Sequence, residues 1–244
     1  MKKNKIIVVL PAYNAEKTLE KTYLKIPKKI VDEIIVVDDA SHDKTVEKAK
    51  KLKLKTFVHK KNLGYGGNQK TCYREALKLG ADIVVMLHPD YQYDPKFIKY
   101  LIQPIIDNSF DVMLGTRIRT RDETLRNGMP LYKYISNRFL TIVENLVLGL
   151  NLSEYHTGFR AFRRNVLEKI NLKNLSNDFI FDQQILISSH ILGFRIGEIF
   201  NPSYYRKDSS SINFKRSLKY GLETLLNLFY YLIDKNKYLQ KSFK

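Results

Sequence analysis

The stretch Ile34-Ile-Val-Val-Asp-Asp-Ala-Ser-His-Asp43 is an apolar run that ends abruptly in carboxylates. Its four apolar residues are typical of a strand that is covered on both faces of a sheet. A similar run, Ile6-Ile-Val-Val-Leu10, precedes it and leads into Pro11-Ala-Tyr-Asn14. Two buried strands, each followed at once by polar residues, predict a parallel sheet with a ligand site at its carboxyl edge.

Outward from these two runs, strand and helix signals alternate through the first half of the chain. Further strands are expected at 55–59, 83–87 and 112–115, and helices at 15–26, 43–52, 68–79 and 95–107. The alternation predicts an α/β fold, a mostly parallel central sheet with helices on both faces. In the second half, helices are expected at 130–150, 178–192 and 213–233.

Length and composition suit one globular α/β domain with a short appendage. The chain has 244 residues, 44% of them hydrophobic, and we expect a domain over 1–210 followed by a basic amphipathic helical region over 211–244. Cys72 is the only cysteine, so no intrachain disulfide can form. A reducing, cytoplasmic location is the natural interpretation.

The formal charge of +17 attracts polyanions such as nucleic acid, anionic lipid head groups or phosphorylated substrates. Charge alone does not distinguish these partners. The alternative is that the many lysines reflect genome composition. No RNA-binding aromatic signature or zinc-ligand spacing accompanies the charge. Nucleic acid is therefore not an expected partner.

The C-terminal region from Arg206 to Lys244 carries nine basic and three acidic residues. Apolar residues recur in it at helical spacing from Leu218 to Ile233, which is typical of a helix that lies in a membrane interface. The same pattern suits a helix packed on the domain or in a dimer seam. We expect peripheral contact with the cytoplasmic face of a membrane, and the pattern also allows a homo-oligomer.

The turn Leu87-His-Pro-Asp-Tyr-Gln-Tyr-Asp-Pro95 holds candidate metal ligands after the fourth expected strand. Asp90 and Gln92 can each supply oxygen, and His88 can add nitrogen, a donor set that suits Mn²⁺ or Mg²⁺. The alternative is that Asp90 only shapes a turn between two prolines. Asp38 and Asp39 pose a similar choice, between ligand contacts and capping of the next helix.

Taken together, the motifs resemble the family 2 glycosyltransferases, in the branch related to polyprenyl (dolichyl) phosphate mannosyl- and glucosyltransferases. The resemblance covers roughly residues 5–210, and its motifs are specific only as a set. They are Pro11-Ala-Tyr-Asn14, Val37-Asp-Asp39, Asn62-Leu-Gly-Tyr-Gly-Gly-Asn68, the 88–95 turn, Gly115-Thr-Arg117 and Tyr155-His-Thr-Gly-Phe-Arg160.

The resemblance implies the nucleotide-sugar fold called GT-A, a UDP- or GDP-linked sugar donor, a divalent cation and inversion at the anomeric carbon. By position, Asp90 and Gln92 would hold the metal, and Arg117 would face phosphates of donor or acceptor. His88 departs from the pattern, because it stands where the family usually has an aspartate. The donor nucleoside would be held by Pro11, Tyr13, Asn14 and Asp39.

Two further segments are candidates for the donor phosphates. Gly66 and Gly67 resemble a phosphate cradle, and the alternative is a tight turn before a helix. Gln69 occupies the third glycine position of a dinucleotide fingerprint, which disfavours a nicotinamide-binding fold. Arg206 begins a basic, serine-rich segment that could close over the diphosphate.

Asp182 is the expected acceptor-side carboxylate. In relatives that glycosylate hydroxyl groups, a carboxylate near this position removes the acceptor proton. A phosphate acceptor is already ionised and needs no such base. The resemblance implies inverting sugar transfer, and the basic amphipathic C-terminal region, which suits an anionic lipid at a bilayer surface, favours a polyprenyl phosphate as acceptor. The alternatives are transfer to a sugar hydroxyl of a glycan or lipid-linked saccharide with Asp182 as base, and a non-catalytic nucleotide- or polyanion-binding protein.

Overall fold

The structure, a computed structural model, describes residues 4–205 and 214–243. A seven-stranded sheet in the order β3-β2-β1-β4-β6-β5-β7 forms its centre. β6 runs antiparallel to β4 and β5, and the other neighbouring pairs are parallel. The expected α/β fold with a mostly parallel sheet is confirmed. The strands are β1 (Ile6–Ala12), β2 (Glu33–Asp38), β3 (Lys55–Val58), β4 (Ile83–Met86), β5 (Val112–Thr116), β6 (Arg160–Arg163) and β7 (Ile196–Phe200).

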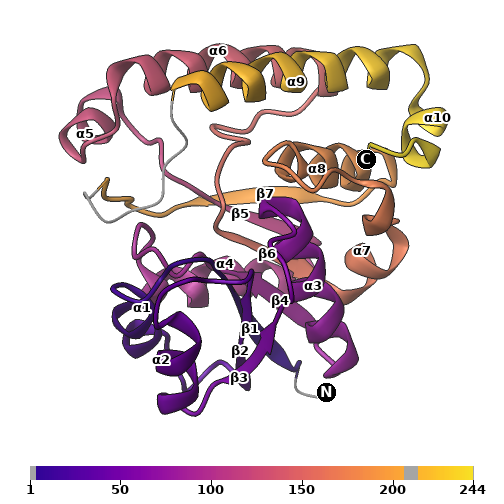
Figure 1. Ribbon diagram of the computed structural model, residues 1–244. Coiled ribbons are helices and arrows are strands. Elements are labelled where there is room, and N and C mark those ends of the chain that lie inside the picture. The colour runs from indigo at the N-terminus through magenta and orange to yellow at the C-terminus, as the bar shows by residue number, and fades with distance from the viewer. Residues whose placement is uncertain (1–3, 206–213, 244) are drawn as a thin grey trace.

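Helices cover both faces of the sheet (Figure 1). Most of the expected helices are present, each shifted by a few residues at its ends. α5 and α7 were not expected from the sequence, and α10 lies in the helical region expected over 211–244. The helices are α1 (Leu19–Lys25), α2 (Thr45–Lys51), α3 (Tyr65–Lys78), α4 (Ile98–Ile106), α5 (Arg121–Arg126), α6 (Leu131–Leu148), α7 (Arg164–Lys169), α8 (Phe181–Ile191), α9 (Phe214–Ile233) and α10 (Lys235–Gln240).

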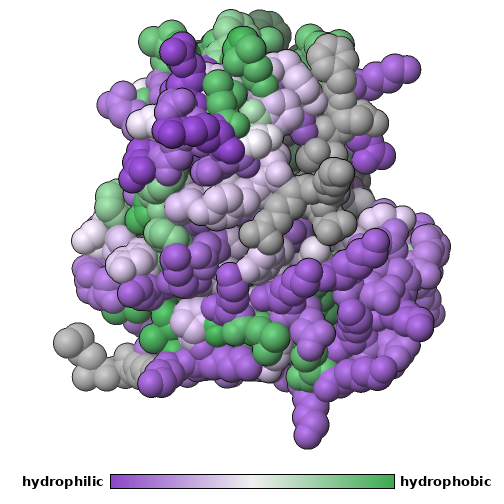
Figure 2. Space-filling view, turned by 90° about the vertical axis from the view of Figure 1, so that its left-hand side faces the viewer, coloured by the Kyte–Doolittle hydropathy of each residue, from purple (hydrophilic) through white to green (hydrophobic). Residues whose placement is uncertain are grey.

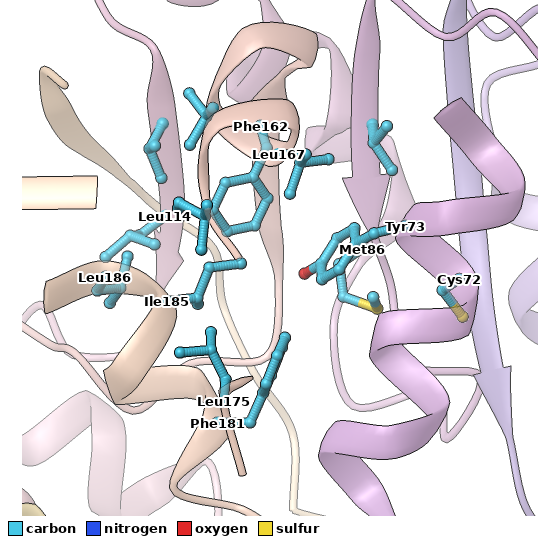
Figure 3. Close-up of a cluster of buried hydrophobic side chains, with 14 of the residues drawn as sticks. Cys72, Tyr73, Met86, Leu114, Phe162, Leu167, Leu175, Phe181, Ile185 and Leu186 are labelled. Atoms are coloured by element: carbon cyan, nitrogen blue, oxygen red, sulfur yellow. The ribbon is translucent and has the colours of Figure 1, made fainter. Parts of the chain in front are cut away.

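Alternating strand side chains divide the core into two clusters, one on each face. Ile7 and Val9 of β1 point into the cluster that α3 and α8 cover, and Figure 3 shows part of it. Val8 and Leu10 point into the other cluster, which α1 and α4 cover. Because both faces are covered, the strands can be apolar throughout, as the two runs at the start of the chain predicted.

The second half of the loop predicted at 62–68 is helical in the structure. α3 begins at Tyr65, so Gly66 and Gly67 lie in the first turn of the helix. Gly64 precedes the helix with φ +85°, a conformation that glycine adopts without a steric penalty. The loop is therefore shorter than the sequence suggested, and the glycines belong to a helix start.

The C-terminal helices share the core of the domain. Leu228 and Tyr231 of α9 and Tyr238 of α10 are buried in the same cluster as α3 and α8. α9 also lies along α6, as Figure 1 shows at the top of the view. None of the helices in the described residues combines the length and apolar content needed to cross a bilayer.

Candidate active site

Unusual backbone conformations cluster at the carboxyl ends of three adjacent strands. Asn14 after β1, Ala40 after β2 and Tyr91 after β4 have φ of 50°, 59° and 58°. Few residues other than glycine adopt positive φ, and such strain tends to collect at functional sites. Three of the five non-glycine residues with positive φ in the described part of the chain therefore lie at the predicted ligand edge of the sheet.

The loops after β1 and β2 are tied together by Asn14. Its backbone N–H donates to Ser41 Oγ at 2.9 Å, and its side-chain oxygen accepts the His42 N–H at 2.9 Å. Tyr13 beside it is 49% exposed, whereas Pro11 is buried within β1. Among the predicted nucleoside contacts, Tyr13 is thus the side chain with a free surface on which a base can stack.

The Asp39 carboxylate organises the loop that precedes α3. Oδ1 accepts the Leu63 N–H at 2.8 Å and lies 2.7 Å from His59 Nδ1, and Oδ2 accepts the Gly64 N–H at 3.1 Å. Asp39 is only 3% exposed. Both oxygens therefore have protein partners. The predicted contact of Asp39 with the nucleoside stays a prediction.

The predicted phosphate cradle at Gly66 and Gly67 is not what the structure shows. Both N–H groups donate to the Asn177 carbonyl, at 2.8 and 3.3 Å. A Cβ added to Gly66 would lie 2.5 Å from the Ser176 carbonyl oxygen. These glycines allow α3 to pack closely against residues 176–178, so the alternative of a tight turn before a helix is the better explanation.

A hydrogen-bonded cluster joins three distant segments at the centre of the site. The Tyr65 hydroxyl donates to Asp182 Oδ2 at 2.8 Å and lies 3.1 Å from His88 Nε2. Gln69 Nε2 donates to Asp182 Oδ1 at 3.0 Å. Asp182 and His88, both predicted from the sequence, therefore lie together, and Tyr65 and Gln69 join them.

The Tyr65 contact bears on the predicted role of His88, which stays a prediction. A hydroxyl has one hydrogen to donate, and Tyr65 gives it to Asp182, so it accepts the Nε2–H of His88. Burial lowers the pKa of His88, against the opposing charges of Asp90 and Asp182, which favours the neutral imidazole. A protonated Nε2 cannot ligate a metal, so the structure does not support His88 as a ligand through this atom.

Arg160 is a fully buried cation that holds the cluster in place. Its guanidinium donates to the carbonyls of Tyr155, Thr157 and Asp182 at 2.9, 2.7 and 2.6 Å. It also lies 3.6 Å from Asp182 Oδ2. The sequence placed Arg160 in a motif but gave it no role, because its partners are backbone carbonyls and a carboxylate that no local pattern predicts.

Gly158 leaves the space that the His88 ring occupies. A Cβ added at Gly158 would lie 2.5 Å from His88 Cδ2 and 2.7 Å from Nε2.

We expect Gly158→Ala to displace His88, to lower the free energy of unfolding by about 1–3 kcal/mol and to lower activity. Gly221→Ala is the matched control, since its Cβ would meet only Leu140 at 3.9 Å. That helical substitution should stabilise α9 by about 0.5–1 kcal/mol. Denaturant unfolding of both variants measures the contrast, and equal stabilities would contradict it.

Asp90 and Gln92 occupy one short turn after β4. Asp90 Oδ1 accepts the Gln92 N–H at 3.1 Å, and the Gln92 carbonyl accepts the Tyr204 N–H at 3.1 Å. The turn is therefore anchored to the segment that follows β7. Among the described residues, no three His, Cys, Asp or Glu side chains gather as a metal-ligand cluster.

Arg117 forms a buried ion pair. It donates to the Glu154 carboxylate through Nε at 2.9 Å and through Nη2, and Nη1 donates to the Tyr205 hydroxyl at 2.8 Å. Burial alone raises the pKa of Glu154, but the charge and hydrogen bonds of Arg117 outweigh it and leave this pKa below its ordinary value. A phosphate contact by Arg117 stays a prediction. Arg206, the other predicted cation, lies outside the described residues.

Known proteins resemble this chain in sequence and in fold. Two curated relatives match most of the chain. An uncharacterized protein of Methanocaldococcus jannaschii is 32% identical, over 86% of this chain and 85% of that protein. A UDP-N-acetylglucosamine–dolichyl-phosphate N-acetylglucosaminyltransferase of Methanococcus voltae is 30% identical, over 80% of this chain and 83% of that protein. Among solved structures, glucosyl-3-phosphoglycerate synthase from Mycobacterium tuberculosis superposes with a TM-score of 0.72 at 19% identity, over 92% of this chain and 79% of that one.

The structural likeness identifies the nucleotide-sugar fold that the sequence motifs implied. The family described as glycosyl transferase family 2 matches residues 7–171. That range includes Asp90, Arg117 and the buried Arg160. The chain therefore belongs to glycosyl transferase family 2 and is a glycosyltransferase.

Proposed function

We propose that this glycosyltransferase moves a sugar, with inversion, from a UDP-linked donor to a polyprenyl phosphate at the cytoplasmic face of a membrane. The observation that carries the choice of acceptor is the state of Asp182. Both of its oxygens already accept hydrogen bonds, from Gln69 and Tyr65, and Arg160 lies beside it. A carboxylate held in this way is a poor general base, and a phosphate acceptor needs none.

Relatives support the same choice. The Methanococcus voltae relative is named for a UDP-linked donor and a dolichyl phosphate acceptor. The Mycobacterium tuberculosis synthase has been solved with UDP and Mn²⁺. A uridine donor and a lipid phosphate acceptor are therefore the first substrates to test for this chain.

A divalent cation fits the oxygen donors of the 88–94 turn. Asp90 and Gln92 would hold it, and the donor diphosphate would complete its coordination, as is common for Mg²⁺ and Mn²⁺. When bound, the cation would neutralise the charge that develops on the leaving diphosphate. A predicted ligand set with one carboxylate, Asp90, suits such a shared site better than a closed protein cage, which would need more acidic ligands.

The chain's own residues would position the reactants. Tyr13 would stack on the uracil ring, and the cluster around Asp182 would fix the acceptor side of the pocket. An acceptor phosphate oxygen attacks the anomeric carbon from the face opposite the diphosphate. The new carbon–oxygen bond forms as the bond to the diphosphate breaks, so UDP leaves and the sugar is inverted.

A thermal-shift panel of UDP, GDP and their sugar conjugates, each with Mn²⁺, Mg²⁺ or EDTA, tests the donor. A ligand that binds only the folded chain adds about 2.7 kcal/mol at a hundredfold excess over its Kd. We expect a shift with UDP and UDP-sugars that EDTA abolishes. Absence of any nucleotide shift, with strong binding of unrelated oligonucleotides, would favour a polyanion-binding protein instead.

The variant Asp182→Asn tests the acceptor. With a polyprenyl phosphate we expect less than about a tenfold loss of kcat/KM, because no proton needs to be removed. A hydroxyl acceptor that relied on Asp182 would lose about a hundred- to ten-thousandfold. Asp178→Asn is the matched control, since its carboxylate pairs with Lys219 at the surface. Unfolding curves of both variants separate loss of catalysis from loss of stability.

A further inference from the structure

α9 turns several polar side chains toward the domain. Thr224 is fully buried and its carbonyl accepts from Gln183 at 3.3 Å, and Asn227 accepts from Gln184 at 3.1 Å. The outer side of α9 is apolar, and Figure 2 shows hydrophobic residues gathered at the end of the molecule where Figure 1 places this helix. A helix on a domain surface normally buries its apolar side. The contacts of the inward polar groups of α9 explain the difference.

Tyr220 lies one helical turn before Thr224 and holds the ring of His156. The Tyr220 hydroxyl lies 2.8 Å from His156 Nδ1, and the two rings meet edge to face with centroids 5.4 Å apart. Burial raises the pKa of Tyr220 well above its ordinary value, so the hydroxyl keeps a proton to donate to Nδ1. His156 Nε2 lies 3.1 Å from Glu144 Oε2 of α6 without forming a hydrogen bond. The Tyr220 hydroxyl is therefore the group that fixes the ring.

The backbone around His156 holds the two buried guanidinium groups of the site. The carbonyls of Tyr155 and Thr157 accept from Arg160. The His156 carbonyl, which stands between them, accepts from Arg117 Nη2 at 2.8 Å. The ring of the same residue is held by α6 and α9. Because ring and carbonyl belong to one residue, the position of the ring helps to set the position of the carbonyl.

Arg117 has one donor left for a ligand. A guanidinium presents five N–H groups. Nε and Nη2 donate to Glu154, Nη2 also donates to the His156 carbonyl, and Nη1 donates to the Tyr205 hydroxyl. No residue in the described part of the chain accepts the second Nη1–H, and the Arg117 side chain is 11% exposed. The partners of Arg117 fix the plane of the guanidinium and so the direction of this remaining N–H.

α6 holds the other partner of Arg117. Asn137 of α6 donates to Glu154 Oε1 at 2.9 Å, and Glu154 is fully buried. α6 and α9 pack against each other. The helix pair thus reaches Arg117 by two routes, one through Glu154 and one through His156. Inward polar side chains of both helices end at the same guanidinium.

We propose that Tyr220 and His156 are positioning residues for Arg117, and that α9 thereby aims the remaining N–H of this guanidinium at a substrate phosphate. A guanidinium recognises phosphate through its charge and its planar set of donors. A guanidinium that is already held in place binds more tightly, because the ligand does not have to order it. The part of this inference that concerns sugar transfer rests on the proposed function, whereas phosphate binding does not.

Three variants test the contact between Tyr220 and His156. Tyr220→Phe and His156→Leu each remove it. His156→Asn has the shape of His156→Leu but keeps an oxygen close to the place of Nδ1, so Tyr220 can still donate. Both substitutions of His156 lose Nε2, so the pair differs only in the contact with Tyr220.

The probes are inorganic pyrophosphate with Mg²⁺, which stands in for the donor diphosphate, and inorganic phosphate, which stands in for an acceptor phosphate. Calorimetric titration at one ionic strength gives the Kd of each. We expect Tyr220→Phe and His156→Leu to raise the Kd of one probe about five- to tenfold, and His156→Asn to raise it less than about twofold. The combined Tyr220→Phe and His156→Leu variant should bind no more weakly than either alone. The probe that responds identifies the phosphate that Arg117 faces.

Tyr230→Phe is the matched control. It removes the same atom from the same helix, and no described residue forms a hydrogen bond with the Tyr230 hydroxyl. Both Kd values should stay at the wild-type level. Unchanged Kd values in Tyr220→Phe and His156→Leu, or equal losses in His156→Leu and His156→Asn, would overturn the proposal. So would a wild type that binds neither anion. Denaturant unfolding confirms that each variant is folded.

Sugar transfer measured in parallel separates this inference from the proposed function. In Tyr220→Phe we expect the KM of the substrate that Arg117 faces to rise about five- to tenfold, with kcat within about twofold of the wild type. A fall in kcat at unchanged KM would indicate a structural role alone and would contradict the proposal. If the wild type transfers no sugar but its anion binding responds as expected, the proposed substrates are wrong and the positioning role stands.

Discussion

Asp90→Asn should lower the rate of sugar transfer by about a hundred- to a thousandfold while the protein stays folded. Asp90 is the only carboxylate among the three residues predicted as metal ligands, and His88 Nε2 lies 3.1 Å from the Tyr65 hydroxyl, which donates to Asp182. An amide in place of this carboxylate removes the negative charge from the predicted ligand set. The measurement is UDP release at saturating donor, across a titration of Mn²⁺.

Asp94→Asn is the matched control within the same turn. Asp94 caps the short helix at Pro95–Phe97 by accepting the Lys96 N–H, and its carboxylate pairs with Lys96 at the surface. We expect it to keep nearly all activity. An Asp90→Asn variant with unchanged activity and unchanged Mn²⁺ dependence would remove Asp90 from the metal site.

Arg160→Met should lower the free energy of unfolding by about 3–5 kcal/mol, the cost of breaking a buried ion pair by removal of one partner. The substitution leaves the carbonyls of Tyr155 and Thr157 without their donor and leaves the buried Asp182 without its cation. Activity should fall as well, since Asp182 and Tyr65 depend on the same cluster. Urea unfolding followed by circular dichroism measures the loss.

Arg126→Met provides the comparison for an exposed ion pair. Arg126 pairs with Asp122 one helical turn away, and both side chains are more than 70% exposed. Such pairs contribute little, so the change should stay below about 0.5 kcal/mol. A similar loss in the two variants would mean that burial of Arg160 does not carry the energy assigned to it.

The first five strands of the sheet were predictable because they depend on local patterns. The apolar runs at 6–10 and 34–37 identify strands covered on both faces, and the polar residues after them mark one edge. β6 was not predicted, because it is four residues long and has arginine at both ends. Its antiparallel insertion depends on pairing with β4 and β5, which no local pattern reports.

The chemistry within the site was only partly predictable, since its contacts join residues that are distant in sequence. Asp182 and His88 were predicted one at a time, and the link between them is Tyr65, a residue in the supposed loop. Arg117 was predicted to bind phosphate from its position alone, but Glu154, its buried partner, follows 37 residues later. Side-chain partners of this kind are set by tertiary packing.

Helical periodicity also has a limit that α6 and α9 illustrate. A repeat of apolar residues every three or four positions shows that a helix has two unlike faces, but it does not show which face is inward. The sequence left a packed helix and a membrane helix open for the region that begins at 213. In the structure one face of α9, which carries Asn227, Leu228 and Tyr231, packs on the domain, and a second, apolar face is exposed.

Transfer of sugar from a UDP-linked donor to a polyprenyl phosphate is tested most directly by following that reaction with labelled UDP-sugars, Mn²⁺ and a short polyprenyl phosphate. We expect label to move to the lipid phase as UDP is released, EDTA to stop the transfer, and the α-linked donor to yield a β-linked product. Label that moves only to a free polyprenol or a glycan hydroxyl, with the phosphate left unused, would contradict it.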